Sequence, residues 1–452
     1  MEPRFDFNER PFIVIWETTQ ACDLACVHCR ACAQPLRSSL ELSTDEAKRL
    51  IDEVAALEAP VFVLTGGDPL KRPDVFELVE YASSHGVRIS LTPSATPLLT
   101  QEAIQKLKEC GLARLAISLD GPSADSHDAF RRVHGSYDWT LRAVRWAREI
   151  RLPVQINTTI TRHNLQYLDS MIALLEQLDI VLWSVFFLVP TGRGSTADLI
   201  SAEEFEQVFE KLYETSHRVK FDIKSTEAQH YRRFLLQRRT EEKRKGNAQP
   251  LPGLLGAGTR DGIGRAPLGI NDGKGFVFVS HLGEVFPSGF LPVSAGNVRE
   301  RPLTDIYRYS PLFVALRESS NLKGKCGVCE FREVCGGSRA RAYALTGDPF
   351  AEEPCCIWQP KVRVTAGDEG TRPEECTREV DLECRPTAAS MAGWNGPKVI
   401  AVLDNSSNRR IAGTVSTEHS TNWFDELCLQ QFAIAASSPK WSKTMVVDAR
   451  QQ

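Results

Sequence analysis

Six short strand-like runs alternate with helix-like stretches over the first 190 residues, and this alternation restricts the possible folds most strongly. The runs cover residues 12–19, 61–67, 87–93, 114–120, 154–160 and 181–189. They are apolar and rich in β-branched residues on both faces, as is typical of parallel strands covered by helices. Successive βα units require right-handed crossovers. The pattern therefore predicts either an open doubly wound sheet or a partial barrel.

Helix signals fill the intervals between these runs. Ser43 is a predicted N-cap, and Glu46 stands three residues later as its capping-box partner. The charged segment at 231–246 predicts a solvated helix, because charge runs usually face solvent. Further helices are expected near residues 73–85, 100–110, 137–149, 164–179 and 202–217.

Length and charge exclude several classes of protein. A chain of 452 residues is long enough for more than one domain. Its 54 Lys and Arg against 58 Asp and Glu give a net charge of −4, without the basic excess of a nucleic-acid-binding protein. The first ten residues are polar, and no apolar run reaches the length of about 18 residues needed to span a membrane. We therefore expect a cytoplasmic protein with no membrane span.

The 13 cysteines are grouped rather than scattered. In a large chain without a secretion signal, tight cysteine groups indicate metal sites rather than a disulfide framework. The first group contains Cys22, Cys26, Cys29 and Cys32, and the second contains Cys326, Cys329, Cys335, Cys355 and Cys356.

The first group directly follows the first strand-like run. Loops at the carboxyl ends of parallel strands build the active sites of such folds. Three thiolates spaced as Cys22-x3-Cys26-x2-Cys29 can hold three irons of a four-iron cube and leave the fourth iron open. A zinc site formed by Cys26, Cys29 and Cys32 with His28 is the alternative.

The motif CDLACVHC at 22–29, followed by TGGDP at 65–69 and SLDG at 118–121, resembles the radical S-adenosylmethionine (SAM) superfamily. The resemblance extends over about 11–190 and 276–360. It implies a partial (β/α)6 TIM-type barrel with a [4Fe–4S] cluster on three Cys. It also implies that SAM binds the open iron and is cleaved to a 5′-deoxyadenosyl radical, which takes hydrogen from a substrate.

The same resemblance implies which residues contact SAM. Main-chain carbonyls at the end of the second strand would accept hydrogen bonds from the SAM amino group, and glycine permits this close approach. Here Asp68 replaces the Glu of the family pattern, and His28 stands where many members have an aromatic residue. No acid–base catalyst is predicted. The predicted cofactor-binding residues are Gly66, Gly67, Asp68, Pro69, Ser118, Asp120, Arg131 and Asn157.

The second group resembles the SPASM extension of cofactor- and peptide-modifying radical SAM enzymes. Ser288 and Arg339 stand where the full SPASM pattern has Cys, so the resemblance implies one auxiliary [4Fe–4S] cluster instead of two. Cys355 is the alternative to Cys356 as the fourth ligand, and a zinc ribbon is the alternative to the cluster. The implied ligands are Cys326, Cys329, Cys335 and Cys356.

These features together predict an order of parts and a range of functions. The barrel is expected at 11–220, a linker with a charged helix and a Gly-rich loop at 221–275, the small Cys-rich iron–sulfur domain at 276–360, and an extension of unknown role at 362–452. The nearest resemblance is to enzymes that modify tetrapyrrole side chains in haem biosynthesis, with peptide maturases second. Only ten residues precede the first strand, which favours a small-molecule substrate or a separately delivered peptide. A ferredoxin or flavodoxin is the expected reducing partner. A non-catalytic metal-stabilised binding protein is the alternative of another class.

Overall fold

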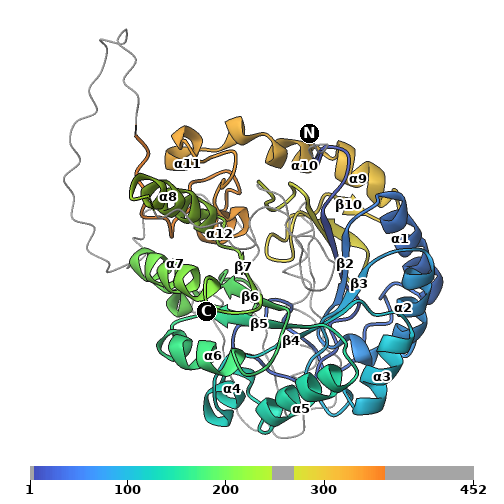
Figure 1. The fold of residues 1–452 in the computed structure, drawn as a ribbon. Coiled ribbons are helices and arrows are strands. Elements are labelled where there is room, and N and C mark those ends of the chain that lie inside the picture. Colours follow the sequence, from blue (N-terminus) through green and yellow to red (C-terminus); the bar gives the residue numbers. More distant parts are fainter. Residues whose placement is uncertain (1–4, 247–268, 362–452) are drawn as a thin grey trace, which may run out of the picture. The chain divides into compact units, whose positions relative to one another are not determined.

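The computed structural model describes residues 5–246 and 269–361, which belong to the first of two compact units, Met1–Ala366. The predicted extension at 362–452 and most of the predicted Gly-rich loop lie outside the described residues. One sheet organises the described part, with the strand order β10-β9-β8-β1-β2-β3-β4-β5-β6-β7. The sheet curves, and helices such as α1, α2, α3 and α5 lie along its outer side (Figure 1).

The strands of the sheet are β1 (Ile13–Glu17), β2 (Val61–Thr65), β3 (Ile89–Leu91), β4 (Arg114–Ser118), β5 (Val154–Ile160), β6 (Leu182–Phe187), β7 (Asp222–Thr226), β8 (Phe276–Val279), β9 (Glu284–Phe286) and β10 (Gly296–Asn297). The helices are α1 (Thr44–Ala56), α2 (Val75–Ser84), α3 (Gln101–Glu109), α4 (Ala124–Arg131), α5 (Ser136–Glu149), α6 (Leu168–Leu175), α7 (Ala202–Ser216), α8 (His230–Arg244), α9 (Leu303–Tyr309), α10 (Pro311–Arg317), α11 (Gly324–Val328) and α12 (Arg339–Thr346).

The order of the strands confirms the partial barrel. Strands β1 to β7 are parallel and follow one another in chain order. A doubly wound sheet would reverse its strand order beside the first strand. The capping box at the start of α1 is also confirmed, because Glu46 N–H donates to Ser43 Oγ and Ser43 N–H donates to Glu46 Oε2.

Three elements differ from the sequence-based expectations. Strand β7 lies in the segment expected to be a linker, and its sequence DIKST has no apolar run to reveal it. Helix α4 was not predicted, because ADSHDAFR is short and polar. Helix α8 is the predicted charged helix, but only its second half is solvated. Tyr231, Phe234 and Leu235 in its first half are buried.

The C-terminal part of the described chain is attached directly to the first barrel strand. Strand β8 pairs in parallel with β1, from Ile13 with Phe276 to Trp16 with Val279. Strands β9 and β10 continue the sheet in antiparallel pairing. This attachment brings residues near 290 to the carboxyl ends of the barrel strands. No helix among the described residues is long and apolar enough to cross a lipid bilayer.

Candidate active site

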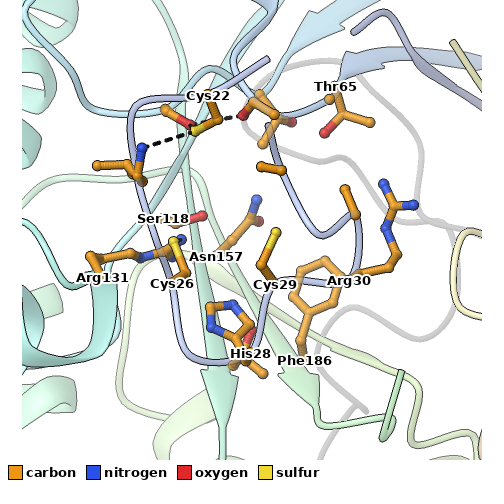
Figure 2. A pocket seen from close by; sticks show the side chains of 18 of the residues that line it. Cys22, Cys26, His28, Cys29, Arg30, Thr65, Ser118, Arg131, Asn157 and Phe186 are labelled. Atoms are coloured by element: carbon orange, nitrogen blue, oxygen red, sulfur yellow. Dashed lines mark hydrogen bonds between the residues drawn. The ribbon is translucent and has the colours of Figure 1, made fainter. Parts of the chain in front are cut away.

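The first cysteine group lies on the loop that follows β1. Cys22, Cys26 and Cys29 line one pocket at the carboxyl ends of the strands, and Figure 2 shows them around a common space. Cys32, which the zinc alternative requires, is not among the residues that line this pocket. The three thiols spaced for an iron–sulfur cube therefore share one pocket, and the thiol of Cys32 does not line it.

Two strand-end loops hold this cysteine loop in place. The Arg193 guanidinium donates from Nε to Cys26 O at 2.9 Å, and Arg193 N–H donates to Cys29 O at 2.9 Å. Ser94 Oγ lies 3.2 Å from Cys22 Sγ. Neither residue is among those predicted from the sequence, although each follows a predicted strand on the side where active sites form. Their position just after a strand was the sequence signal that could have identified them.

The two glycines of the TGGDP segment allow β2 to end against the start of the cysteine loop. A Cβ on Gly66, whose φ is +153°, would lie 2.3 Å from Thr19 O, and a Cβ on Gly67 would lie 2.4 Å from Ala21 O. Gly67 N–H donates to Thr19 O at 2.7 Å. The close approach that requires glycine here is therefore an approach between two backbone segments of the protein. Contact of these glycines with SAM stays a prediction.

Arg131 connects the cysteine loop with β4 and β5. Its Nη1 donates to Cys26 Sγ at 3.4 Å, and its Nη2 forms an ion pair with Asp120. Thr159 N–H also donates to Asp120, at 2.7 Å. Burial lowers the pKa of Arg131, but Asp120 and Cys26 raise it by more, so this pKa lies above its ordinary value. The pocket therefore contains a fixed positive charge beside one of its thiols.

The predicted cofactor-binding residues divide into two sets. The first set lines the pocket and comprises Gly66, Gly67, Ser118, Arg131 and Asn157. Asp68, Pro69 and Asp120 are buried but do not line it. Asp68 accepts hydrogen bonds from Thr96 Oγ1 at 2.9 Å and from Leu70 N–H at 3.1 Å, and burial raises its pKa to about 6. Asp68 therefore shapes the turn after β2.

His28 forms part of the pocket wall between two of the thiols. Its ring packs against Phe130 with centroids 4.6 Å apart. Burial, with Arg131 and Arg193 nearby, lowers the pKa of His28 well below its ordinary value. The imidazole is therefore neutral at physiological pH.

The opposite side of the pocket is apolar and comes from two distant parts of the chain. Phe186 and Leu188 lie at the end of β6, and Phe290 comes from the segment after β9. Arg30 reaches the same region, with its guanidinium 4.6 Å from the ring centroid of Phe278. Its Nη2 donates to Glu17 at 2.8 Å. The wall thus combines aromatic surface with one guanidinium group.

A second pocket lies in the C-terminal part. It is lined by four thiols of the second cysteine group, those of Cys326, Cys329, Cys335 and Cys356. Cys355 does not line it and is packed in the hydrophobic core instead. Across residues 5–246 and 269–361, no three His, Cys, Asp or Glu side chains are arranged to hold a single metal ion.

The two positions that depart from the full SPASM pattern have other contacts. Ser288 is fully buried and accepts a hydrogen bond from Phe290 N–H at 3.0 Å. Arg339 donates to the carbonyls of Pro349, at 3.0 Å, and Ala351, at 2.5 Å. Arg339 Nη2 also lies 4.0 Å from Cys326 Sγ, one of the thiols of the second pocket. The number of auxiliary clusters stays a prediction.

A buried ion pair connects the two pockets. Arg341 donates to Glu353 Oε1 at 3.1 Å, and both side chains are almost completely shielded from solvent. Arg341 also donates to Leu188 O, at 3.2 Å, on the wall of the first pocket. Glu353 N–H donates to Cys326 Sγ, at 3.3 Å, in the second pocket. The Arg341–Glu353 pair is therefore bonded on one side to the wall of the first pocket and on the other side to a thiol of the second.

Comparison with known proteins identifies the family. The model for the radical SAM superfamily matches residues 16–175. The chain is 43% identical over 356 residues to the AdoMet-dependent heme synthase of Methanosarcina barkeri, with 77% of this chain and 97% of that protein covered. The chain belongs to the radical SAM superfamily. It is therefore an enzyme, and its family implies SAM and a [4Fe–4S] cluster as cofactors.

Other radical SAM proteins are similar at lower identity. The Fe-coproporphyrin III synthase of Methanosarcina barkeri is 30% identical, covering 78% of this chain and 89% of that protein. The PqqA peptide cyclase of Rhodopseudomonas palustris is 28% identical, covering 77% and 88%. The structure of Streptococcus suis SuiB bound to S-adenosylmethionine has a TM-score of 0.59 at 15% identity, covering 77% and 78%, and shows the shared fold. The heme synthase is thus more similar to this chain than the peptide cyclase is.

Proposed function

We propose that this enzyme forms haem from an iron porphyrin by radical modification of its propionate side chains. The observation that carries the proposal is the 43% identity to an AdoMet-dependent heme synthase over 97% of that protein. The apolar wall of the first pocket supports it. Phe186 and Phe290, with ring centroids 6.3 Å apart, offer aromatic surface to a flat macrocycle.

Cys22, Cys26 and Cys29 are the proposed ligands of the cluster that binds SAM. They fit a cube with one open iron, because three thiols share the pocket and the fourth nearby thiol does not. When bound, this cluster and SAM supply the 5′-deoxyadenosyl radical. Arg131 is the proposed partner of the SAM carboxylate, since it is charged and lies beside Cys26. Ser118 and Asn157 present hydrogen-bonding groups to the same space.

The proposed reaction is an oxidative decarboxylation. Haem carries vinyl groups where Fe-coproporphyrin III, the product named for one relative, carries two of its propionates. Removing one hydrogen atom from the propionate carbon next to the ring leaves a carbon radical. Loss of CO2 and of one electron then gives the vinyl group. The departing electron requires an acceptor.

The second pocket is the proposed place for that acceptor. Its four thiols are the proposed ligands of an auxiliary [4Fe–4S] cluster, and with all four irons ligated it has no open position for SAM. Burial raises the pKa of Cys335 to about 12, so metal binding must displace the proton of this thiol. The Arg341–Glu353 pair lies between the two pockets and makes hydrogen bonds toward both.

The experiment that tests the function is turnover of the reconstituted enzyme. Anaerobically reconstituted protein should convert Fe-coproporphyrin III to haem with SAM and dithionite, forming one 5′-deoxyadenosine for each side chain converted. The Cys22/Cys26/Cys29→Ala variant should form neither product. Cleavage of SAM without change in the porphyrin would contradict the proposal, and modification of a precursor peptide instead would favour a peptide maturase. Zinc without labile sulfide would show that the pockets hold a different metal.

A further inference from the structure

His230 occupies an unusual position at the start of α8. One side of its ring packs against two phenylalanines of α7, with centroids 5.2 Å from Phe205 and 4.9 Å from Phe209. His230 is fully shielded from solvent. It also lines the second pocket, together with the four thiols proposed as cluster ligands. The ring therefore lies between an aromatic core and the cysteine pocket.

Neither ring nitrogen of His230 has a hydrogen-bond partner within the described part of the chain. Buried polar groups in proteins are almost always paired, so an unpaired imidazole requires an explanation. Burial lowers the pKa of His230 to about 3, which leaves a neutral ring with one N–H donor. The phenylalanine side offers no conventional acceptor. The pocket side contains the four thiols and the Glu353 carboxylate, whose oxygens already accept hydrogen bonds from Arg341 and from two main-chain N–H groups. The thiols are therefore the acceptors left for His230.

We propose that His230 donates its ring N–H to a sulfur of the auxiliary cluster in the second pocket. This inference rests on the proposed function of that pocket. Hydrogen bonds to the sulfurs of an iron–sulfur cluster are among the factors that set its reduction potential. A donor stabilises the reduced cluster, which carries one more negative charge, so it raises the potential. His230 is thus a positioning residue that makes the cluster a better acceptor of the electron released by the substrate.

The test is the reduction potential of the auxiliary cluster alone. In the full-length Cys22/Cys26/Cys29→Ala background, the first cluster is removed and only the second gives an EPR signal. Iron and sulfide are counted first, and the midpoint potential is then measured by EPR-monitored titration. His230→Phe should shift the potential to a lower value with the cluster retained. His230→Gln keeps an N–H donor and should retain most of the original potential.

His217→Phe is the matched control. His217 follows α7, outside the second pocket, and its Nδ1 lies 2.8 Å from Tyr213 O. This substitution should leave the potential unchanged. Equal potentials for His230→Phe and the unsubstituted background, with the cluster intact in both, would overturn the role of His230. Absence of the second cluster before any change at His230 would instead show that the proposed use of the pocket is wrong.

A second measurement needs no substitution at His230. Pulsed EPR of the same background protein labelled with ¹⁵N-histidine should detect weak coupling between the reduced cluster and one histidine nitrogen. No detectable coupling would contradict the hydrogen bond. It would indicate that the N–H points toward the ring of Phe209 instead.

Discussion

Replacing Gly67 with alanine should impair assembly of the first cluster. The new Cβ would lie 2.4 Å from Ala21 O, 2.6 Å from Gln20 O and 2.7 Å from Ala21 C. All three are backbone atoms, so the clash can be relieved only by moving the segment that leads into Cys22. That movement would also strain the hydrogen bonds from Gly67 N–H to Thr19 O and from Asp68 N–H to Ala21 O.

The size of the expected loss of stability follows from these contacts. Overpacking of a well-packed core costs about 1–3 kcal/mol, and a weakened buried hydrogen bond adds roughly 1 kcal/mol. We therefore expect Gly67→Ala to lower the free energy of unfolding of the apoprotein by about 2–4 kcal/mol, measured by urea denaturation. The amount of iron bound after anaerobic reconstitution should fall by the iron that the first cluster contains, while the second cluster is retained.

Gly86→Ala provides the matched control. Gly86 has a φ of +75°, and a Cβ there would meet no atom within 4 Å. Only the left-handed backbone conformation opposes alanine at this position, and it should lower the free energy of unfolding by about 1–2 kcal/mol. Iron loading of this variant should be complete. If Gly67→Ala retained full iron and lost no more stability than Gly86→Ala, the reasoning about the glycine contact would be refuted.

Two further predictions concern a buried carboxyl group and the fourth auxiliary ligand. Burial raises the pKa of Asp68 from 3.8 to about 6, so its contribution to stability is present at low pH and is lost as pH rises from about 4 to 6. Asp68→Asn should therefore stabilise the apoprotein by up to about 3 kcal/mol at pH 7 and by much less at pH 4, and equal urea-denaturation differences at the two pH values would contradict this. Cys356→Ser should remove the iron of the second cluster, whereas Cys355→Ser should keep it, because only Cys356 lines the second pocket. The reverse pattern in iron and sulfide analysis would assign the fourth ligand to Cys355.

The sequence was sufficient for features encoded by local pattern. The six strand-like runs and the capping box at Ser43 depend on neighbouring residues, and all are present in the structure. The spacing of Cys22, Cys26 and Cys29 likewise predicted three side chains that share one pocket. Periodicity alone left a doubly wound sheet open, and the family resemblance correctly favoured a barrel.

Features formed by long-range contacts were not predictable in this way. Phe290 reaches the first pocket only because β8 pairs with β1, and nothing in the sequence specifies that pairing. The ion pair between Arg30 and Glu17 depends on the path of the cysteine loop after β1. His230 directly precedes the charged segment whose pattern suggested a solvated helix, whereas packing of α8 against α7 buries it.

The most direct test of the proposed reaction is the fate of one hydrogen atom. Fe-coproporphyrin III with deuterium on the propionate carbons next to the ring should be incubated with the reconstituted enzyme, SAM and dithionite. Mass spectrometry of the 5′-deoxyadenosine should then show one deuterium, gained in step with haem formation. Haem formed alongside unlabelled 5′-deoxyadenosine, or labelled porphyrin left unchanged while SAM is consumed, would contradict radical abstraction from the propionate side chain.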